Sequence, residues 1–306
     1  MTTVIALGGN ALVRNGERGT AAEQLANLRT ACVALAPLLA DPRVVVTHGN
    51  GPQVGNELLR QERAADVAPP LPLYVAVAQT QAEIGALLAA ELRPVAGRRV
   101  TCVLTHVEVA GDDPAFAEPT KPIGPFYSEE EAHRLERERG WDVVSDAGRG
   151  WRRVVASPEP VEIVELESIR ALLDAGDVVI AAGGGGIPVA RRDDRLKGVD
   201  AVIDKDRASA LLATALGAER LVILTDVPAL LRDFGGPEVT EIRELTVADA
   251  ADLLPQLAAG SMRPKLEAAI AFARAGGETL IASAESLEEA LAGAAGTTVR
   301  PDTSGV

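Results

Sequence analysis

The sequence predicts an α/β fold, namely a three-layer αβα sandwich around an open, mainly parallel central sheet with a small protruding subdomain. Short runs rich in β-branched residues alternate with longer segments whose apolar residues recur at helical spacing. This alternation is typical of parallel strands connected by helices that cover both faces of a sheet. In addition, glycine clusters follow several predicted strands, and open sheets of this type bind ligands at the carboxyl ends of their strands.

The predicted elements follow this alternating order through most of the chain. Six segments are predicted as strands: Thr3–Leu7, Arg43–Thr47, Arg99–Glu108, Asp177–Ala182, Arg220–Thr225 and Glu278–Ser283. Five longer segments are predicted as helices: Ala21–Ala40, Tyr74–Leu92, Ile163–Ala175, Asp206–Leu216 and Lys265–Ala275. With 306 residues, of which 47% are hydrophobic, the chain is long enough to build a full core, and we expect residues 1–306 to form a single domain.

One segment, residues 110–160, does not follow this alternation of strands and helices. It is rich in proline, contains the run Ser128–Glu131, and ends in a predicted hairpin at Trp151–Ser157. A serine followed by acidic residues is typical of a helix start, because the hydroxyl caps the first turn and carboxylates favour the positive end of the helix dipole. We therefore expect residues 110–160 to be an inserted lid subdomain that protrudes from the edge of the sheet.

Composition limits the ligands and the location. A formal net charge of -14 and a sequence pI of about 4.8 oppose binding to nucleic acid and to acidic membranes. The first residues lack the basic segment of a signal peptide, and no apolar stretch approaches the roughly 20 residues that cross a bilayer. Cys32 and Cys102 lie in apolar runs, as unpaired thiols do in a reducing compartment. We expect a cytoplasmic protein with neither a nucleic-acid nor a membrane partner.

Three glycine-containing loops follow predicted strands. The first is Gly8–Asn10, and the second is Gly49–Gly51, where Pro52 suits the start of a helix whose N-terminus attracts anions. The third contains four consecutive glycines, Gly183–Gly186, and their entropic cost on folding favours a phosphate cradle over a purely structural role. None of these loops matches the P-loop or the dinucleotide-binding fingerprint, so neither class of protein is supported.

Lysine is rare in this chain. Only four of the 30 basic residues are lysines, at Lys121, Lys197, Lys205 and Lys265. A compact ammonium group that follows a moving phosphoryl group is not readily replaced by the wide, planar guanidinium, so the lysines are candidates for catalysis. Chance retention on the surface is the alternative for any one of them. Lys197 lies in a charged segment and is expected to be solvated.

Two of the lysines lie where helices are predicted to begin. Lys205 stands between Asp204 and Asp206, which fits either a capped helix with a surface ion pair worth about 0–1 kcal/mol or a phosphate-binding lysine held by a carboxylate. Lys265 lies in a first turn, where the helix dipole disfavours a cation and a bound phosphate would remove the conflict. The three histidines have no partners at metal-ligand spacing, so no protein metal site is predicted.

Taken together, these motifs make the chain resemble the carbamate kinases of the amino acid kinase superfamily. The motifs are Thr47–Gly55, Thr120–Ser128, Gly183–Gly186 and Ile203–Asp206, and the resemblance runs in order from Val4 to about Ser283. It implies a homodimer that uses Mg²⁺ and ATP or ADP to interconvert ADP plus carbamoyl phosphate with ATP plus carbamate. ATP formation in arginine catabolism is the expected direction.

The resemblance also implies roles for individual residues. Lys121, Lys205, Lys265 and Asp206 would form the catalytic set, with Lys121 reaching in from the lid and Asp206 organising the lysines. The carbamate and the transferring phosphoryl group would be held by Gly8, Gly9, Asn10, Gly49, Asn50 and Gly51. The nucleotide would be bordered by Gly183, Gly184, Gly185, Gly186, Asp204, Thr225, Asp226 and Met262.

Two segments depart from the pattern of that family. Residues 225–231 contain no tyrosine where one is expected near the adenine, and Gln79–Glu83 reads Gln-Thr-Gln-Ala-Glu in place of a Gln-Gly-Gln-Ile-Gly-like sequence. Because carbamate is already an anionic nucleophile, alignment and charge stabilisation are the expected catalytic tasks, and no general base is required. Two alternatives stay open: an acylphosphate-forming kinase of an amino acid carboxylate, and a protein that senses nucleotide or carbamoyl phosphate without catalysis.

Overall fold

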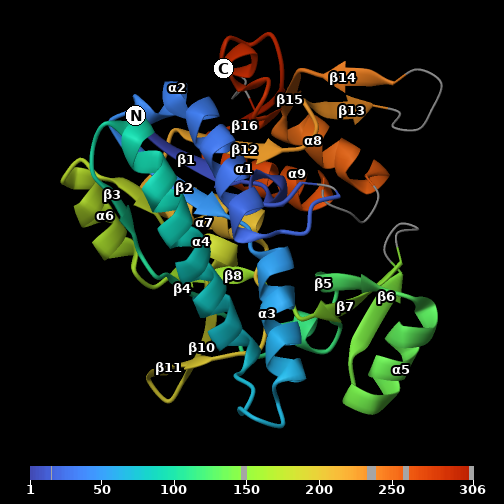
Figure 1. The fold of residues 1–306 in the computed structure, drawn as a ribbon. Coiled ribbons are helices and arrows are strands. Elements are labelled where there is room, and N and C mark those ends of the chain that lie inside the picture. Colours follow the sequence, from blue (N-terminus) through green and yellow to red (C-terminus); the bar gives the residue numbers. More distant parts are fainter. Residues whose placement is uncertain (15, 146–149, 233–238, 258–261, 303–306) are drawn as a thin grey trace.

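The computed structural model describes residues 1–14, 16–145, 150–232, 239–257 and 262–302. Its main element is an eight-stranded sheet (Figure 1), in which every neighbouring pair is parallel except β16 and β17. In spatial order the strands are β15 (Glu244–Thr246), β17 (Thr297–Arg300), β16 (Glu278–Ser283), β12 (Arg220–Thr225), β1 (Thr2–Leu7), β2 (Arg43–His48), β9 (Val178–Ile180) and β3 (Val100–Cys102). A separate antiparallel pair is formed by β13 (Leu230–Arg232) and β14 (Thr240–Ile242).

Helices cover both faces of the main sheet and bury two apolar cores. Because side chains alternate along a strand, Val4 and Ala6 of β1 join one core, while Ile5 and Leu7 join the other. The first core is covered by α6 (Leu166–Asp174), α7 (Lys205–Leu216), α8 (Val247–Leu253) with η4 (Leu254–Gln256), and α9 (Met262–Arg274). The second is covered by η1 (Gly9–Ala11), α1 (Ala21–Ala34), α2 (Ala36–Leu39), α4 (Leu73–Ala96) and α10 (Leu287–Leu291). The predicted αβα sandwich is therefore confirmed.

The prediction of one strand over Arg99–Glu108 is wrong, because this segment forms two strands in different sheets. β3 ends the main sheet, and β4 (His106–Val109) belongs to a four-stranded sheet with the order β11-β10-β4-β8. Between them, the main-chain N–H of Thr105 donates to Gln81 Oε1 at 2.7 Å, so a tertiary contact interrupts a run that local propensity would continue. The other strands of this sheet are β10 (Ile187–Arg192), β11 (Arg195–Gly198) and β8 (Pro160–Ile163).

The residues between β4 and β8 form a small sheet and a helix, which Figure 1 shows in green, set apart from the main sheet. The elements are η2 (Pro114–Phe116), β5 (Lys121–Tyr127), α5 (Glu129–Arg139), β6 (Asp142–Ser145) and β7 (Trp151–Val155), and the strand order is β5-β7-β6. The hydroxyl of Ser128 caps α5 by accepting the N–H of Glu131 at 3.2 Å. Since β4 and β8 are antiparallel neighbours, the chain leaves and returns at adjacent points. We call residues 110–160 the lid, and its status as an inserted subdomain stays a prediction.

The lid packs against α3 (Gly51–Arg63) through two glycines. A Cβ built on Gly55 would lie 1.9 Å from the Cα of Gly124 in β5, so the two backbones are in direct contact. Gly124 has a φ of 73°, a left-handed conformation that glycine adopts without strain. Farther along α3, Glu62 forms ion pairs with Arg139 and Arg153 of the lid. These contacts fix β5, which carries Lys121, relative to the start of α3.

Helix α4 has 24 residues and is apolar enough, by length and composition alone, to cross a membrane. The expectation that no segment approaches this length is therefore wrong. In the structure, α4 packs against α1 and β3, and a Cβ built on its Gly85 would lie 2.4 Å from the Sγ of Cys102. The helix thus serves here as a core helix behind the strand ends.

Candidate active site

Two loops at neighbouring strand ends form one side of the site. β1 and β2 are paired as far as Leu7 and His48, and the N–H of Gly49 donates to the carbonyl of Leu7 at 3.3 Å. Gly9 and Gly51 face open space, since among the described residues no atom lies within 4 Å of a Cβ built on either glycine. Open space beside main-chain amides allows the close approach of a small anion.

The start of α7 is held beside β2 by hydrogen bonds. Asp204 is the N-cap, and its Oδ1 accepts the N–H of Asp206 at 2.9 Å. One turn later, Ser209 Oγ donates to the carbonyl of Lys205 at 2.7 Å and lies 2.7 Å from Thr47 Oγ1 at the end of β2. The helix start that carries Lys205 is therefore anchored next to the second glycine loop.

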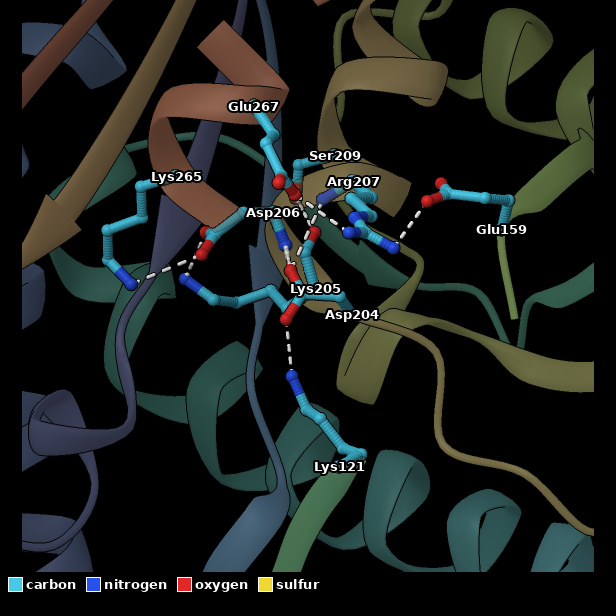
Figure 2. Close-up of polar contacts among 9 residues, drawn as sticks. All are labelled: Lys121, Glu159, Asp204, Lys205, Asp206, Arg207, Ser209, Lys265 and Glu267. Atoms are coloured by element: carbon cyan, nitrogen blue, oxygen red, sulfur yellow. Dashed lines mark hydrogen bonds and ion pairs between the residues drawn. The ribbon is translucent and has the colours of Figure 1, made fainter. Parts of the chain in front are cut away.

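Three lysines from distant parts of the sequence meet two aspartates at this point (Figure 2), and we call these five side chains the lysine cluster. Lys121, the first residue of β5, forms an ion pair with Asp204. Lys205 Nζ lies 2.8 Å from Asp206 Oδ1, and Lys265 Nζ, on α9, lies 3.2 Å from Asp206 Oδ2. Three positive charges face two negative ones, in a chain whose net charge is -14. This local surplus of positive charge favours an anionic ligand.

Burial and ion pairing act in opposite directions on the pKa values of the cluster. Burial opposes the ionisation of Asp206, but Lys205 and Lys265 outweigh it and lower the pKa of this carboxyl. Burial also opposes the ionisation of Asp204, and the charge and hydrogen bond of Lys121 lower its pKa. Burial lowers the pKa of Lys205, while Asp206 opposes that shift. Because the side chains of Lys205 and Asp206 are only 12% and 4% exposed, the alternative of a surface ion pair is wrong.

A second group of ion pairs surrounds the cluster (Figure 2). Arg207 pairs with Glu159, near the end of the lid, and with Glu267 of α9 at 2.7 Å. Nearby, the N–H of Val202 donates to the carbonyl of Ala156 at 2.9 Å. The start of α7 is therefore tied both to the exit of the lid and to the helix that carries Lys265.

Gly183–Gly186, the four-glycine loop, is closely packed by protein. A Cβ built on each glycine would lie only 2.2 or 2.3 Å from the nearest neighbour, in order His48, Asn50, Ile203 and Val107. Three of the glycines also have positive φ values, of 68°, 87° and 90° for Gly184, Gly185 and Gly186. Packing and backbone conformation account for all four glycines, so their number does not by itself favour a phosphate cradle. Their position beside the nucleotide stays a prediction.

The other predicted site residues lie in different surroundings. Gly8 packs against the end of β12, with a built Cβ 2.7 Å from a carbonyl oxygen, which brings the first loop next to Thr225. Asp226 is exposed, and Met262 begins α9 and packs against the first apolar core. The main chain of Asn10 lies in η1, and its side chain is outside the part of the chain that the structure describes.

Two buried residues of α4 that hold the loops were missed by the sequence analysis. Gln81 Nε2 donates to the carbonyl of Gly183 at 2.7 Å, and Thr80 Oγ1 accepts a hydrogen bond from Asn50 Nδ2 at 3.0 Å. Both residues are 1% exposed. The available signal was the presence of an amide and a hydroxyl in a mostly apolar helix, because buried polar groups have hydrogen-bond partners.

His48 is buried at the end of β2 and supports the second loop. Its Nδ1–H donates to the carbonyl of Gly49 at 3.0 Å. Burial lowers the pKa of His48 to about 4, and the nearby Lys205 acts in the same direction. The imidazole is therefore neutral at neutral pH and leaves the charge of the lysine cluster unchanged.

We expect the free energy of unfolding to fall as the pH is lowered from 6.5 to about 4. In this interval the unfolded chain, with the ordinary histidine pKa of 6.5, binds a proton that folded His48 excludes. The stabilisation is complete above the unfolded pKa, is lost as the pH falls towards the folded pKa, and amounts to about 3 kcal/mol. Urea denaturation across this range measures the effect.

His48→Asn should show a shallower dependence on pH, whereas His133→Asn, a change on the lid where the side chain is 38% exposed, should keep the wild-type dependence. Identical pH profiles for the wild type and His48→Asn would contradict this account.

Comparison with known proteins agrees with this geometry. A model of the amino acid kinase family matches residues 1–283. The carbamate kinase of Halobacterium salinarum is 48% identical over 303 residues, covering 98% of each chain, and that of Pyrococcus horikoshii is 45% identical over 309 residues, covering 97% of this chain and 98% of the relative. The solved structure of carbamate kinase from Giardia lamblia bound to citric acid has a TM-score of 0.92 at 40% identity and covers 98% of both chains. The Giardia lamblia enzyme bound to AMP-PNP has a TM-score of 0.88 at 40% identity, with 98% of each chain covered.

The chain therefore belongs to the amino acid kinase family, the class that its parallel sheet and its loops at the strand ends define. Within that family, its full-length relatives place it among the carbamate kinases. The resemblance inferred from the glycine and lysine motifs is confirmed.

Proposed function

We propose that this protein transfers a phosphoryl group between ATP and carbamate, and from carbamoyl phosphate to ADP in the reverse direction. The observation that carries this proposal is the lysine cluster, which gathers Lys121, Lys205 and Lys265 and places Lys205 beside the second glycine loop. The related Giardia lamblia enzyme bound to AMP-PNP, an ATP analogue, supports ATP and ADP as the nucleotides.

The proposed reaction requires alignment of the two substrates rather than a general base. In ATP formation, a terminal phosphate oxygen of ADP attacks the phosphorus of carbamoyl phosphate, and the bond from phosphorus to the carbamate oxygen breaks. Carbamate leaves as an anion, so no proton has to be moved at the reacting centre. Lys205 and Lys265 would neutralise the phosphate oxygens, Lys121 would approach from the lid, and the amides at Gly9 and Gly51 would hold the transferring group.

Mg²⁺ is proposed to enter with the nucleotide. The described residues contain no group of three or more His, Cys, Asp or Glu side chains that could hold a metal, and lysines engage both Asp204 and Asp206. These side chains therefore do not form a metal site of their own, whereas phosphate oxygens and water are the usual ligands of Mg²⁺ at such enzymes. We likewise propose a homodimer that forms ATP in arginine catabolism, as the resemblance implies, and a cytoplasmic location, as the composition and the two cysteines indicate.

The direct test is a coupled assay of ATP formation from ADP and carbamoyl phosphate, run beside acetyl phosphate. ATP formation with carbamoyl phosphate and little with acetyl phosphate supports the proposal. No ATP with either compound, together with binding of carbamoyl phosphate, would support a sensing protein instead. Comparable rates with both compounds would point to a broader acylphosphate kinase.

We expect Lys121→Ala to lower kcat about 10²-fold and to leave the Kd for ADP nearly unchanged. Lys121 belongs to the lid and pairs with Asp204, whereas Lys205 and Lys265 lie on the helices of the body. Steady-state kinetics and calorimetry with ADP measure the two quantities. Lys197→Ala, on the exposed strand β11, is the matched control and should behave as the wild type. An unchanged kcat in Lys121→Ala would remove the lid role.

A further inference from the structure

We propose that Thr80 is a positioning residue that fixes the side-chain amide of Asn50 at the start of α3. The proposal rests on the proposed function, together with the expectation that Asn50 helps to hold the carbamate and the transferring phosphoryl group. Both side chains are buried, at 1% exposure for Thr80 and 2% for Asn50, and Asn50 Nδ2 donates to Thr80 Oγ1 at 3.0 Å.

The hydroxyl determines which end of the amide it faces. A hydroxyl has one proton to donate, and Thr80 Oγ1 has the carbonyls of Ala76 at 2.9 Å and Val77 at 3.1 Å as acceptors within α4. With that proton directed to the helix, the oxygen of Thr80 can only accept from Asn50. The nitrogen end of the Asn50 amide is thereby held against α4, and its oxygen end is turned away.

The packing of Gly184 against the amide and the missing N-cap hydrogen bond of Asn50 support this arrangement. Gly184 lies against the amide, because a Cβ built on it would be 2.3 Å from Asn50 Nδ2 and 2.5 Å from Cγ. Asparagine is among the best N-cap residues. The Asn50 side chain nevertheless makes no capping hydrogen bond to α3, a helix that the structure describes over its full length. The bond to Thr80 diverts the amide from capping, so the first-turn amides of α3 are left for an anionic ligand.

The neighbouring residue, Gln81, shows that α4 positions more than one of the glycine loops. Gln81 Nε2 donates to the carbonyl of Gly183 at 2.7 Å, and its Oε1 accepts the N–H of Thr105 at 2.7 Å. Two successive buried residues of α4 therefore position the second glycine loop and the four-glycine loop. A shift of either side chain would change the spacing between the two loops.

The test compares Thr80→Val, which removes the hydroxyl at similar volume, with Thr80→Ser, which keeps it. We expect Thr80→Val to lower kcat/KM for carbamoyl phosphate about tenfold or more, with the KM for ADP within about twofold, and Thr80→Ser to retain at least about half of the wild-type value. Thr30→Val is the matched control, because the hydroxyl of Thr30 makes the same bond to a helix carbonyl, that of Ala26, without holding a loop. Thr80→Ala removes the same hydroxyl and replaces the valine variant if that variant does not fold.

The outcomes separate a positioning role from a structural one. A fall in Tm with equal losses for both substrates, equal impairment of Thr80→Val and Thr80→Ser, or unchanged kinetics in Thr80→Val would each overturn the proposal. The orientation is also measured without turnover, by hydrogen exchange of the Asn50 side-chain amide in NMR spectra. Faster exchange in Thr80→Val supports the bond even if the wild type makes no ATP, a result that would reject only the proposed function, and unchanged exchange overturns the proposal.

Discussion

In the Asp206→Ala variant, the free energy of unfolding is expected to fall by about 3–5 kcal/mol. Asp206 is 3% exposed and is the shared counter-ion of Lys205 and Lys265. Its removal leaves two ammonium groups close together in a buried site without their carboxylate. The loss is a large part of the roughly 5–15 kcal/mol that stabilises an ordinary domain. Urea denaturation at pH 7 measures it.

Asp174→Ala is the matched control for this measurement. Asp174 is 65% exposed and pairs with Arg43 at the surface, where an ion pair contributes about 0–1 kcal/mol. Combining Asp206→Ala with Lys205→Met removes one of the two uncompensated charges and should restore part of the stability. A loss in Asp206→Ala no larger than in the control would show that the lysine cluster does not depend on this carboxylate.

Lys205→Met is expected to lower kcat by about 10³-fold or more in ATP formation from carbamoyl phosphate. Methionine keeps much of the side-chain volume and removes the charge. A Cβ built on Gly49 would lie 3.8 Å from Lys205 Cδ, so the aliphatic part of the Lys205 side chain passes directly beside the second glycine loop. The variant should still fold, because Asp206 retains Lys265 as a partner. Steady-state kinetics and thermal denaturation measure these two outcomes.

Two further lysine variants test whether the loss of kcat is specific to the ammonium group of Lys205. Lys205→Arg should be nearly as inactive as Lys205→Met, because the wide guanidinium does not fit a side-chain site that is 12% exposed. Lys197→Met changes an exposed lysine of β11 and should retain the wild-type kcat. A folded Lys205→Met enzyme with kcat within tenfold of the wild type would exclude a direct role in phosphoryl transfer.

Six of the eight strands of the main sheet lie in segments that could be predicted, because these segments are apolar over most of their length, whereas β15 and β17 were not predicted. β1 and β12 are short β-rich runs followed by polar or glycine-rich segments, so local pattern and final structure agree. The second sheet was missed, since β10 ends in arginines and β11 is exposed. Their pairing with each other and with β4 depends on contacts that no local pattern contains.

The members of the lysine cluster could be predicted from residue type, because rare lysines among many arginines point to a chemical requirement. Their partners could not, since Lys121 and Asp204 are 83 positions apart, and Lys265 and Asp206 are 59 apart. The same limit explains why the structural role of Gly183–Gly186 could not be predicted. The atoms that exclude a Cβ there belong to residues such as His48 and Ile203, which only the folded structure brings close.

The position of β1 inside the main sheet has a consequence for folding during translation. This strand is translated before both of its partners, β2 and β12, and its second partner is not complete until residue 225 has been made. At roughly 5–20 residues per second, one edge of β1 stays unpaired for on the order of ten seconds or more after β2 emerges from the ribosome. An open apolar strand edge readily pairs with other chains, so chaperone protection during translation should influence the yield of soluble enzyme.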